Sequence, residues 1–519
     1  MLWSYLRRQS LRIRNMVMNK NQVSNAKQFE KLAEIEKYIQ SGQLAVAINT
    51  ISTLNRVSKG KIPRELLYRL SNLARRAGAP LLASRILAPL FRTDGVDMFP
   101  TASERAAYGA CLSTLGANQE AERVFSQSED KKHPDLILQQ SFNFIRLWDY
   151  KNAIPLLRSY IEQPQISEYQ RLIAKVNLLA AYLSEEKFTS FSLEFKSCQK
   201  LAQEQKAHLL LANCLEMRAQ KHLSQKKWES IESDLKLAKQ LTKDLDSVYT
   251  YYIKKWELFA WQDQNQALSS RSLSVLFYKK FHQLKQECKS KQYWEVERDC
   301  DFQLAIRDSS QETLNKVYFG TPFDSYREKI RRKIGTSVSI PDYWDYSNSP
   351  NAKNTLVIEP QDLRKIPYRL FMALFRDLYK PLSIGLVQSL VFPDEVFIPE
   401  SSSKRINQLC IRLRQLLTNK DLDFDIRVFR YMYSVALGNQ QAIRLFSPDK
   451  PLSVLYNSAE DILEKEILSG KWGQRFLFKD VQTNLPEYLL RRVLKKCVNN
   501  RTIIYVAQGP KSIYFLAKK

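Results

Sequence analysis

Five carboxylates crowd one short stretch of the chain, and their types and spacing could do chemistry. The segment WEVERDCDFQLAIRD (294–308) contains Glu295, Glu297, Asp299, Asp301 and Asp308. Paired carboxylates can hold the divalent cations of a metal-dependent nuclease. Here, however, arginines alternate with the acids and no lysine-bearing strand follows. We therefore expect a solvated, charged helix face and no metal site.

Other catalytic signatures are missing from the sequence. The chain has four histidines, none of them after His282, which argues against a zinc site or a histidine-based triad in the C-terminal half. It has no phosphate-binding P-loop and no GxSxG, HExxH or dinucleotide-binding motif. We expect a protein that is not an enzyme and that has no catalytic residues and no cofactor.

Two basic segments near the C-terminus have a pattern that suits phosphate binding. PESSSKRINQLCIRLRQLL (399–417) and LPEYLLRRVLKKCVNN (485–500) each place a proline at or near the start, followed by apolar residues at helical spacing with Lys and Arg on the other side. The predicted inward stripes are Ile406, Leu409, Leu413, Leu416 and Leu417 beside Cys410 in the first helix, and Leu490, Val493, Leu494, Cys497 and Val498 in the second. The candidate DNA-binding residues are Ser402, Ser403, Lys404, Arg405, Gln408 and Arg412 in the first segment, and Tyr488, Arg491, Arg492, Lys495 and Lys511 in or after the second.

The elements around the first basic helix follow a recognisable order. The sequence predicts a short strand at 355–360, a helix over 367–379 and a second helix over LSIGLVQSLVFP before it, and a strand pair over LDFDIRVFRYMYSVAL after it. Helix, helix, basic helix and strand pair is the order of a winged helix-turn-helix, whose third helix enters the DNA major groove.

FIPESSSKRINQLCIRLRQLL resembles the recognition-helix segment of OmpR/PhoB-type effector domains. The resemblance is carried by Pro399, Ser402, Arg405 and the Ile411-Arg412-Leu413-Arg414 run with Leu417. It implies that Ser402, Lys404, Arg405, Gln408 and Arg412 face DNA. No phosphoacceptor receiver domain precedes the segment, so aspartyl-phosphate control is not implied.

The second basic helix lies in a similar plan. An amphipathic helix over 458–472 and a short helix over 477–485 precede it, and two alternating strands around Gln508-Gly509-Pro510-Lys511 follow. The pattern predicts a second winged helix-turn-helix.

The first half of the chain repeats a different pattern. A turn residue is followed five residues later by a small residue and four later by a larger apolar one, as in Gly78–Ala83–Leu87 and Gly116–Ala121–Phe125. Gly42–Ala47–Ile51 and Trp148–Ala153–Leu157 fit as well, with weaker echoes around Phe188 and Trp228. Such a period is typical of helix–turn–helix repeats, and ACLSTLGANQEAERVFSQ (110–127) resembles a tetratricopeptide repeat.

The predicted fold is mainly α: an N-terminal tetratricopeptide-like α-solenoid followed by two tandem winged helix-turn-helix (α+β) domains. The expected boundaries are a basic arm at 1–28, repeats at 29–264, a helical cap or connecting layer at 265–335, a linker at 336–354, and winged helices at 355–440 and 441–519.

Composition restricts the partners. The 80 Lys and Arg against 54 Asp and Glu give a net charge of +26, which favours polyanions. No apolar run is long enough to span a bilayer, so we expect no membrane partner. Seven cysteines without CxxC spacing predict reduced, buried thiols and a cytoplasmic setting.

The leading hypothesis is a bacterial, cytoplasmic transcriptional regulator that binds double-stranded DNA and senses a peptide or protein on its repeats. One alternative is a protein–protein adaptor without nucleic acid, and another is a helical-repeat RNA-binding protein of an organelle. The sequence leaves the oligomeric state, the DNA target and the repeat ligand open.

Overall fold

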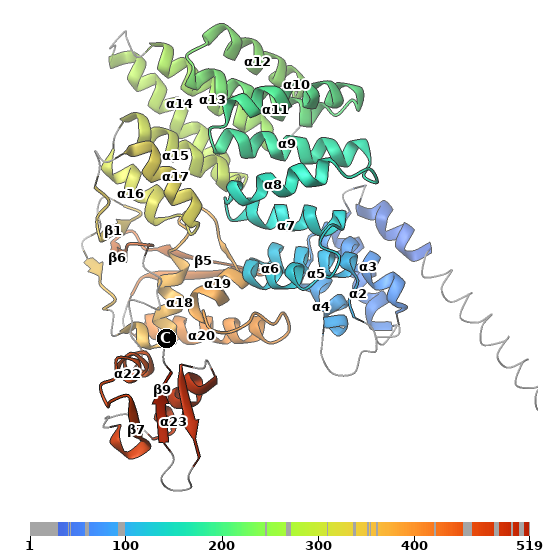
Figure 1. The fold of residues 1–519 in the computed structure, drawn as a ribbon. Helices are drawn as coiled ribbons and strands as arrows, with labels where there is room; N and C mark the ends of the chain where they lie inside the picture. The colour runs from blue at the N-terminus through green and yellow to red at the C-terminus, as the bar shows by residue number, and fades with distance from the viewer. Residues whose placement is uncertain are drawn as a thin grey trace, which may run out of the picture.

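The computed structural model describes residues 30–39, 41, 43–57, 62–91, 99–243, 247–265, 271–308, 310–335, 339–349, 352, 354–359, 362–419, 422–449, 459–481, 487–499, 502–507 and 513–517. The expected basic arm at 1–28 lies outside them. The described chain is mainly helical with three small sheets (Figure 1). No helix in these ranges is both long enough and apolar enough to cross a bilayer.

Helices stacked as antiparallel neighbours make up the first two thirds of the chain. After a helix over residues 30–39, they are α2 (Leu44–Val57), α3 (Arg64–Arg76), α4 (Pro80–Leu87), the 3-10 turn η1 (Ala88–Phe91), α5 (Ala102–Thr114), α6 (Asn118–Ser126), α7 (Pro134–Arg146), α8 (Tyr150–Ile161), α9 (Glu168–Ser184), α10 (Phe188–Glu204), α11 (His208–Ser224), α12 (Trp228–Leu241), α13 (Val248–Asn265), α14 (Arg271–Ser290), α15 (Trp294–Asp308), α16 (Gln311–Phe319) and α17 (Asp324–Ile334).

The repeat pattern has a clear structural cause at the turns. Gly78, Gly116 and Trp148 have a positive φ, and so do Glu186 and Lys226 in the degenerate copies. The amide after each of them bonds back to a carbonyl five residues earlier, as in Asp149 N to Phe144 O at 2.9 Å, which closes the helix C-terminus. The small residue five positions later is fully buried at Ala83, Ala121 and Ala153, which allows close helix packing.

The first C-terminal module follows the helical stack and combines two sheets with three helices. Its elements are β1 (Tyr343–Ser347), β2 (Asn354–Leu356), the 3-10 turn η3 (Asp362–Arg364), α18 (Ile366–Leu374), β3 (Leu382–Ser383), α19 (Ile384–Val391), α20 (Ser402–Asn419), β4 (Phe424–Phe429), β5 (Met432–Leu437) and β6 (Gln441–Phe446). Strand order is β1-β6-β2 in one sheet and β3-β5-β4 in the other.

The region expected to be a linker takes part in this module. Residues 343–347 form β1, which pairs antiparallel with β6 from Tyr343↔Phe446 to Ser347↔Ala442. The aromatic residues that set the segment apart in the sequence therefore serve a strand, and Trp344 and Tyr346 pack against the main core.

The first module and the helical stack share one hydrophobic core. A single cluster joins Leu112, Ala121 and Phe125 of the α5–α6 pair to Leu370 of α18 and Ile384 of α19. The backbones meet where the Gly385 amide donates to the Leu115 carbonyl at 2.7 Å. A Cβ on Gly385 would come within 2.4 Å of the Ala117 nitrogen, so only glycine allows this approach. Figure 1 shows α19 beside α6 at this contact.

The second C-terminal module has a core of its own. It comprises α22 (Ala459–Leu468), β7 (Arg475–Leu477), the 3-10 turn η4 (Phe478–Asp480), α23 (Glu487–Asn499), β8 (Ile503–Val506) and β9 (Ile513–Leu516), with strand order β7-β9-β8. Its buried cluster is drawn from within the module, from Leu463 and Phe476 to Leu494 and Ile503. The predicted short helix at 477–485 is described only over η4.

The predicted burial of the two basic helices is confirmed. Ile406, Leu409, Leu413 and Leu417 are buried in α20, and Leu490, Val493, Leu494 and Cys497 in α23. All seven cysteines are buried and unbridged.

Candidate ligand cavity and basic helices

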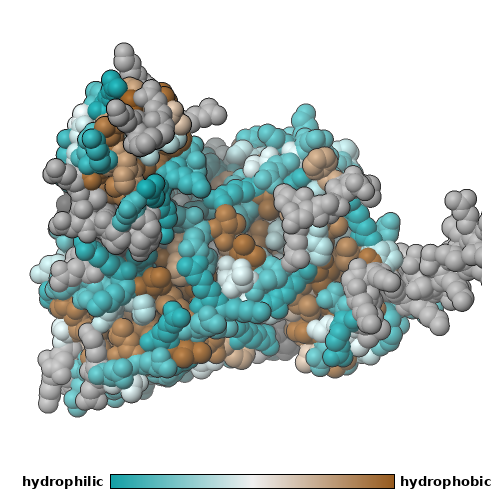
Figure 2. Space-filling model, turned by 90° about the horizontal axis from the view of Figure 1, so that it is seen from below, coloured by the Kyte–Doolittle hydropathy of each residue, from teal (hydrophilic) through white to brown (hydrophobic). Residues whose placement is uncertain are grey.

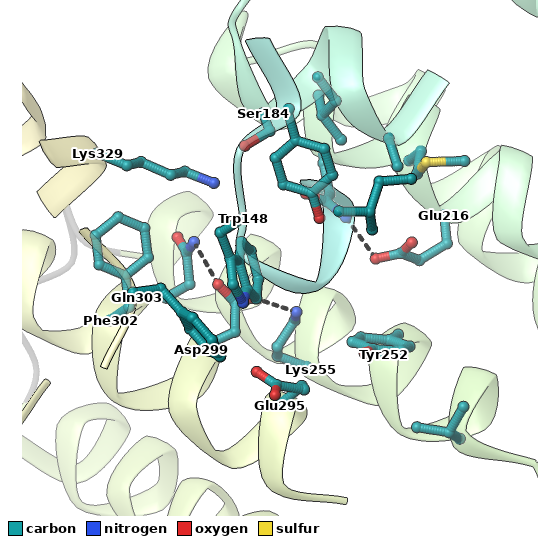
Figure 3. A pocket seen from close by; sticks show the side chains of 18 of the residues that line it. Trp148, Ser184, Glu216, Tyr252, Lys255, Glu295, Asp299, Phe302, Gln303 and Lys329 are labelled. Carbon is teal, nitrogen blue, oxygen red and sulfur yellow. Dashed lines mark hydrogen bonds and ion pairs between the residues drawn. The ribbon is translucent and has the colours of Figure 1, made fainter. Parts of the chain in front are cut away.

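A cavity of about 1110 Å³ lies inside the curve of the helical stack. Its lining comes from helices and turns between α5 and α17, and from the segment of the first module around β3. Figure 3 shows Trp148, at the α7–α8 turn, near the centre of this lining, with Glu216, Lys255, Asp299 and Lys329 around it.

Aromatic residues form much of the apolar lining. The Trp148 ring meets Tyr326 edge-on, with centroids 4.6 Å apart, and Tyr326 also packs on Phe302. Tyr252 from α13 lies beside the Lys255 amine, 4.9 Å from ring centroid to nitrogen. Trp148, Tyr252 and Phe302 line the cavity next to charged groups, and the buried Tyr326 packs against Trp148 and Phe302.

The acids of α15 differ in burial: Asp301 is buried, Glu295, Glu297 and Asp299 are half-buried, and Asp308 is exposed. The expectation of a solvated face is therefore wrong for the middle of this helix. Asp301 is 2% exposed and accepts hydrogen bonds from Lys316 Nζ and Tyr379 Oη, each at 2.9 Å. Arg298 is fully buried and donates to the Asp377 carboxylate at 2.6 Å. The buried Arg298–Asp377 ion pair and the hydrogen bond from Tyr379 to Asp301 join the stack to the first module here. Among the described residues, no group of three or more potential ligands could hold a metal ion.

Lys255 and Asp299 form an ion pair in the cavity wall. Burial favours the neutral lysine, but the charges of Asp299 and Glu216 outweigh burial and raise the Lys255 pKa. Burial would also raise the pKa of Asp299, yet Lys255 lowers it overall. Both groups therefore stay charged at neutral pH.

Glu216 on α11 behaves differently. It is 4% exposed, and burial raises the pKa of its carboxyl to about 7, with Lys255 opposing the shift. Glu216 Oε1 accepts a hydrogen bond from Gln220 Nε2 at 2.6 Å. At neutral pH this carboxyl is divided between its charged and neutral forms.

The start of α20 departs from the sequence prediction. Ser402 and Ser403 are buried, and their hydroxyls serve the local chain: the Ile398 amide donates to Ser402 Oγ at 3.0 Å, and Ser403 Oγ donates to the Pro399 carbonyl at 3.2 Å. Arg405 is paired with Glu395 and stacks on Phe392, 3.6 Å from the ring centroid. These three candidate DNA contacts are occupied within the protein.

Lys404, Gln408 and Arg412 project outward as predicted. All three side chains are exposed, and among the described residues neither Lys404 nor Arg412 forms an ion pair. Ile411, on the same outer side, is 54% exposed. Seen from below, the molecule mixes hydrophobic patches with hydrophilic ones (Figure 2), and the exposed apolar residues of this module also include Val396, Ile398 and Phe429.

The outward cations of α23 are more engaged. Arg491 donates to Glu487 at 2.8 Å from Nε and stacks on Phe478 at 4.6 Å. Arg492 and Lys495 are exposed. The side chain of Tyr488 and all of Lys511 lie outside what the structure describes.

Sequence reasoning missed the cavity. Its wall residues are spread from Ser113 to Met432 and share no motif. The one available signal was Trp148, a bulky aromatic at a position where the other strong repeats carry glycine.

Comparison with known proteins finds similarity among solved structures. No protein-family model matches the chain, and no curated protein matches it. A solved structure, the apo form of RapI, is 10% identical and aligns over 76% of this chain and 98% of that chain, with a TM-score of 0.35. At this score the likeness does not assign a function.

Proposed function

We propose that this protein is a helical-repeat regulator that binds an extended segment of a protein partner inside the cavity of the stack. The observation that carries the proposal is the cavity itself, about 1110 Å³ with contributions from repeats and first module alike. Sites for drug-sized molecules usually measure about 300–1,000 Å³. The volume here suits several residues of a peptide.

The lining also suits a peptide. Aromatic faces such as Trp148 and Phe302 can pack against side chains, while Asn213, Gln220 and Gln303 offer amides to a peptide backbone. Because the first module lines the cavity through Asp377, Lys380 and Met432, a bound segment would contact both parts at once.

The test is retention of random octapeptides by the immobilised full chain, read by mass spectrometry. Ala180 lines the cavity, so Ala180→Trp should fill part of it and lower retention. Leu193→Trp is the matched control because Leu193 is 74% exposed and absent from the lining. Equal retention by the wild type and both variants would refute binding in the cavity.

Double-stranded DNA binding by the first module is a second candidate. The order α18, β3, α19, α20 and the β4–β5 hairpin, with sheet order β3-β5-β4, supports this candidate because a winged helix would have such an order. Lys404, Gln408 and Arg412 are exposed along the outer side of α20, where a recognition helix would meet base edges. Arg427 and Arg430 of the hairpin are also exposed.

The DNA candidate is tested by selecting bound duplexes from a random pool at two salt concentrations. Recovery of a common sequence with salt-sensitive affinity would support it. If no duplex is retained at low salt, DNA binding is refuted and peptide binding in the cavity is the one proposed function that remains.

A further inference from the structure

The charges lining the cavity do not balance. Five of the six carboxylates in the lining are held by a cation: Glu186 by Lys333, Asp263 by Arg307, Asp299 by Lys255, and Glu295 and Asp377 by Arg298. The sixth, Glu216, is the carboxyl that burial keeps partly protonated. Each of these five carboxylates thus has a cation in contact, although Arg298 serves both Glu295 and Asp377.

Four cations of the same lining have no such partner. Among the described residues, no carboxylate forms an ion pair with Arg146, Lys226, Lys329 or Lys380. They come from α7, the α11–α12 turn, α17 and the segment before β3. Unpaired positive charge therefore enters the cavity from several sides.

Lys329 is the most informative of the four. Its amine points toward Trp148 and Ser184 (Figure 3) and lies 6.0 Å from the Trp148 ring centroid and 5.8 Å from that of Phe302. Its neighbours on α17 are paired, Arg332 with Glu185 and Lys333 with Glu186. Burial lowers the Lys329 pKa, with Asp299 opposing the shift, as expected for a cation short of counter-charge.

Arg146 presents a second cation at the other end of the Trp148 turn. Its guanidinium donates to Ser113 Oγ at 3.2 Å, and its side chain is exposed where it lines the cavity.

We infer that the segment bound in the cavity is acidic, with carboxylates meeting Lys329 and Arg146 and an apolar side chain packing on Trp148 and Phe302. The inference rests on the proposed function and specifies the class of peptide. Charge-assisted hydrogen bonds are shorter and stronger than neutral ones, and a carboxylate entering the cavity finds cations that have not been neutralised.

The experiment compares labelled octapeptides of the same length, rich in Glu, Gln or Lys and each carrying one Leu, by fluorescence anisotropy with the full chain. We expect the Glu peptide to bind tightest. Lys329→Gln and Arg146→Gln should each weaken it about tenfold, the loss of about one charge-assisted hydrogen bond. Lys279→Gln is the matched control, because Lys279 is exposed on α14 and absent from the cavity lining.

The outcomes separate the two proposals. Tighter binding of the Gln or Lys peptide that Ala180→Trp abolishes would overturn the acidic class and leave the cavity function standing. No cavity binding by any peptide would overturn both. Tripolyphosphate is added as a competitor: binding of tripolyphosphate but not of the Glu peptide would identify a phosphate site and overturn the acidic-peptide inference.

Discussion

The two C-terminal modules each place a basic helix before a pair of antiparallel strands, but in different settings. The first shares a continuous core with the helical stack and meets it backbone to backbone at Gly385. The second closes its core with its own residues. Outward cations differ too: Arg412 of α20 forms no ion pair among the described residues, whereas Arg491 of α23 is held by Glu487.

The comparison shows that amphipathic pattern alone does not decide what a basic helix does. Both helices bury the predicted stripe, because alternation of apolar and charged residues fixes which side faces inward. Whether the outward cations can bind a partner depends on nearby acids. Glu395 pairs with Arg405 of α20, and Glu487 pairs with Arg491 of α23. The packing of the first module against the helical stack then fixes the orientation of α20 relative to the cavity.

The largest effect should come from breaking the joint between the first module and the stack. Arg298→Ala leaves the Asp377 carboxylate buried without its partner, which costs about 3–5 kcal/mol of unfolding free energy. Chemical denaturation should show the main transition shifted and the protection of 459–517 against hydrogen exchange unchanged. If the substitution also lowered the hydrogen-exchange protection of 459–517, the second module would not be independent of the first.

The reverse variant is Leu494→Ala. Leu494 is 1% exposed in the core of the second module, and its truncation should cost about 2–5 kcal/mol there. Hydrogen exchange should accelerate in α22 and α23 while α5, α15 and α18 keep their protection. Loss of protection throughout the chain would show that the second module supports the first.

The two basic helices should differ in DNA binding if the second candidate function holds. Arg412→Ala should cost about 1–3 kcal/mol of binding free energy, since an unpaired guanidinium can contact a base. Arg491→Ala should cost less because that side chain is already engaged with Glu487. Mobility shifts give both values, with Arg427→Ala on the hairpin as the comparison. A larger loss from Arg491→Ala would reverse the assignment of the two helices.

The last prediction is a pH dependence of stability that originates in the stack. Because the Glu216 pKa is raised from 4.5 to about 7 in the fold, the native state binds more protons than the unfolded state between these values. Stability should therefore fall as pH rises through this window. Glu216→Gln should flatten that slope in thermal unfolding, and an unchanged slope would assign it to another group.

The sequence predicted what depends on neighbours along the chain. The repeat register at Ala83 and Ala121, the buried stripes of α20 and α23, and strands β4 and β5 all follow local periodicity. Glu186 and Lys226 show how far this extends: their copies look degenerate, yet both residues adopt the left-handed turn conformation.

What failed depends on partners far away in the chain. Asp299 and Lys255 are 44 residues apart, and Arg298 and Asp377 are 79 apart, so the fate of the α15 acids could not be read from their own segment. The strand in the expected linker has the same cause, since its pairing partner β6 lies about a hundred residues later. The cavity could not be predicted for the same reason, because residues from Ser113 to Met432 together form its wall.

The close contact between the segments around Gly116 and Gly385 restricts motion of the first module relative to the helical stack. A Cβ on Gly116 would come within 2.0 Å of Ser383 Oγ, and one on Gly385 would come within 2.7 Å of the backbone of Leu115 to Ala117, so the two segments leave no room for a larger residue at either glycine. A displacement of one of these segments therefore moves the other with it. Any widening that admits a ligand must then arise by flexing among the successive helix pairs from α7 to α14, and the direction of α20 will follow the α5–α6 turn.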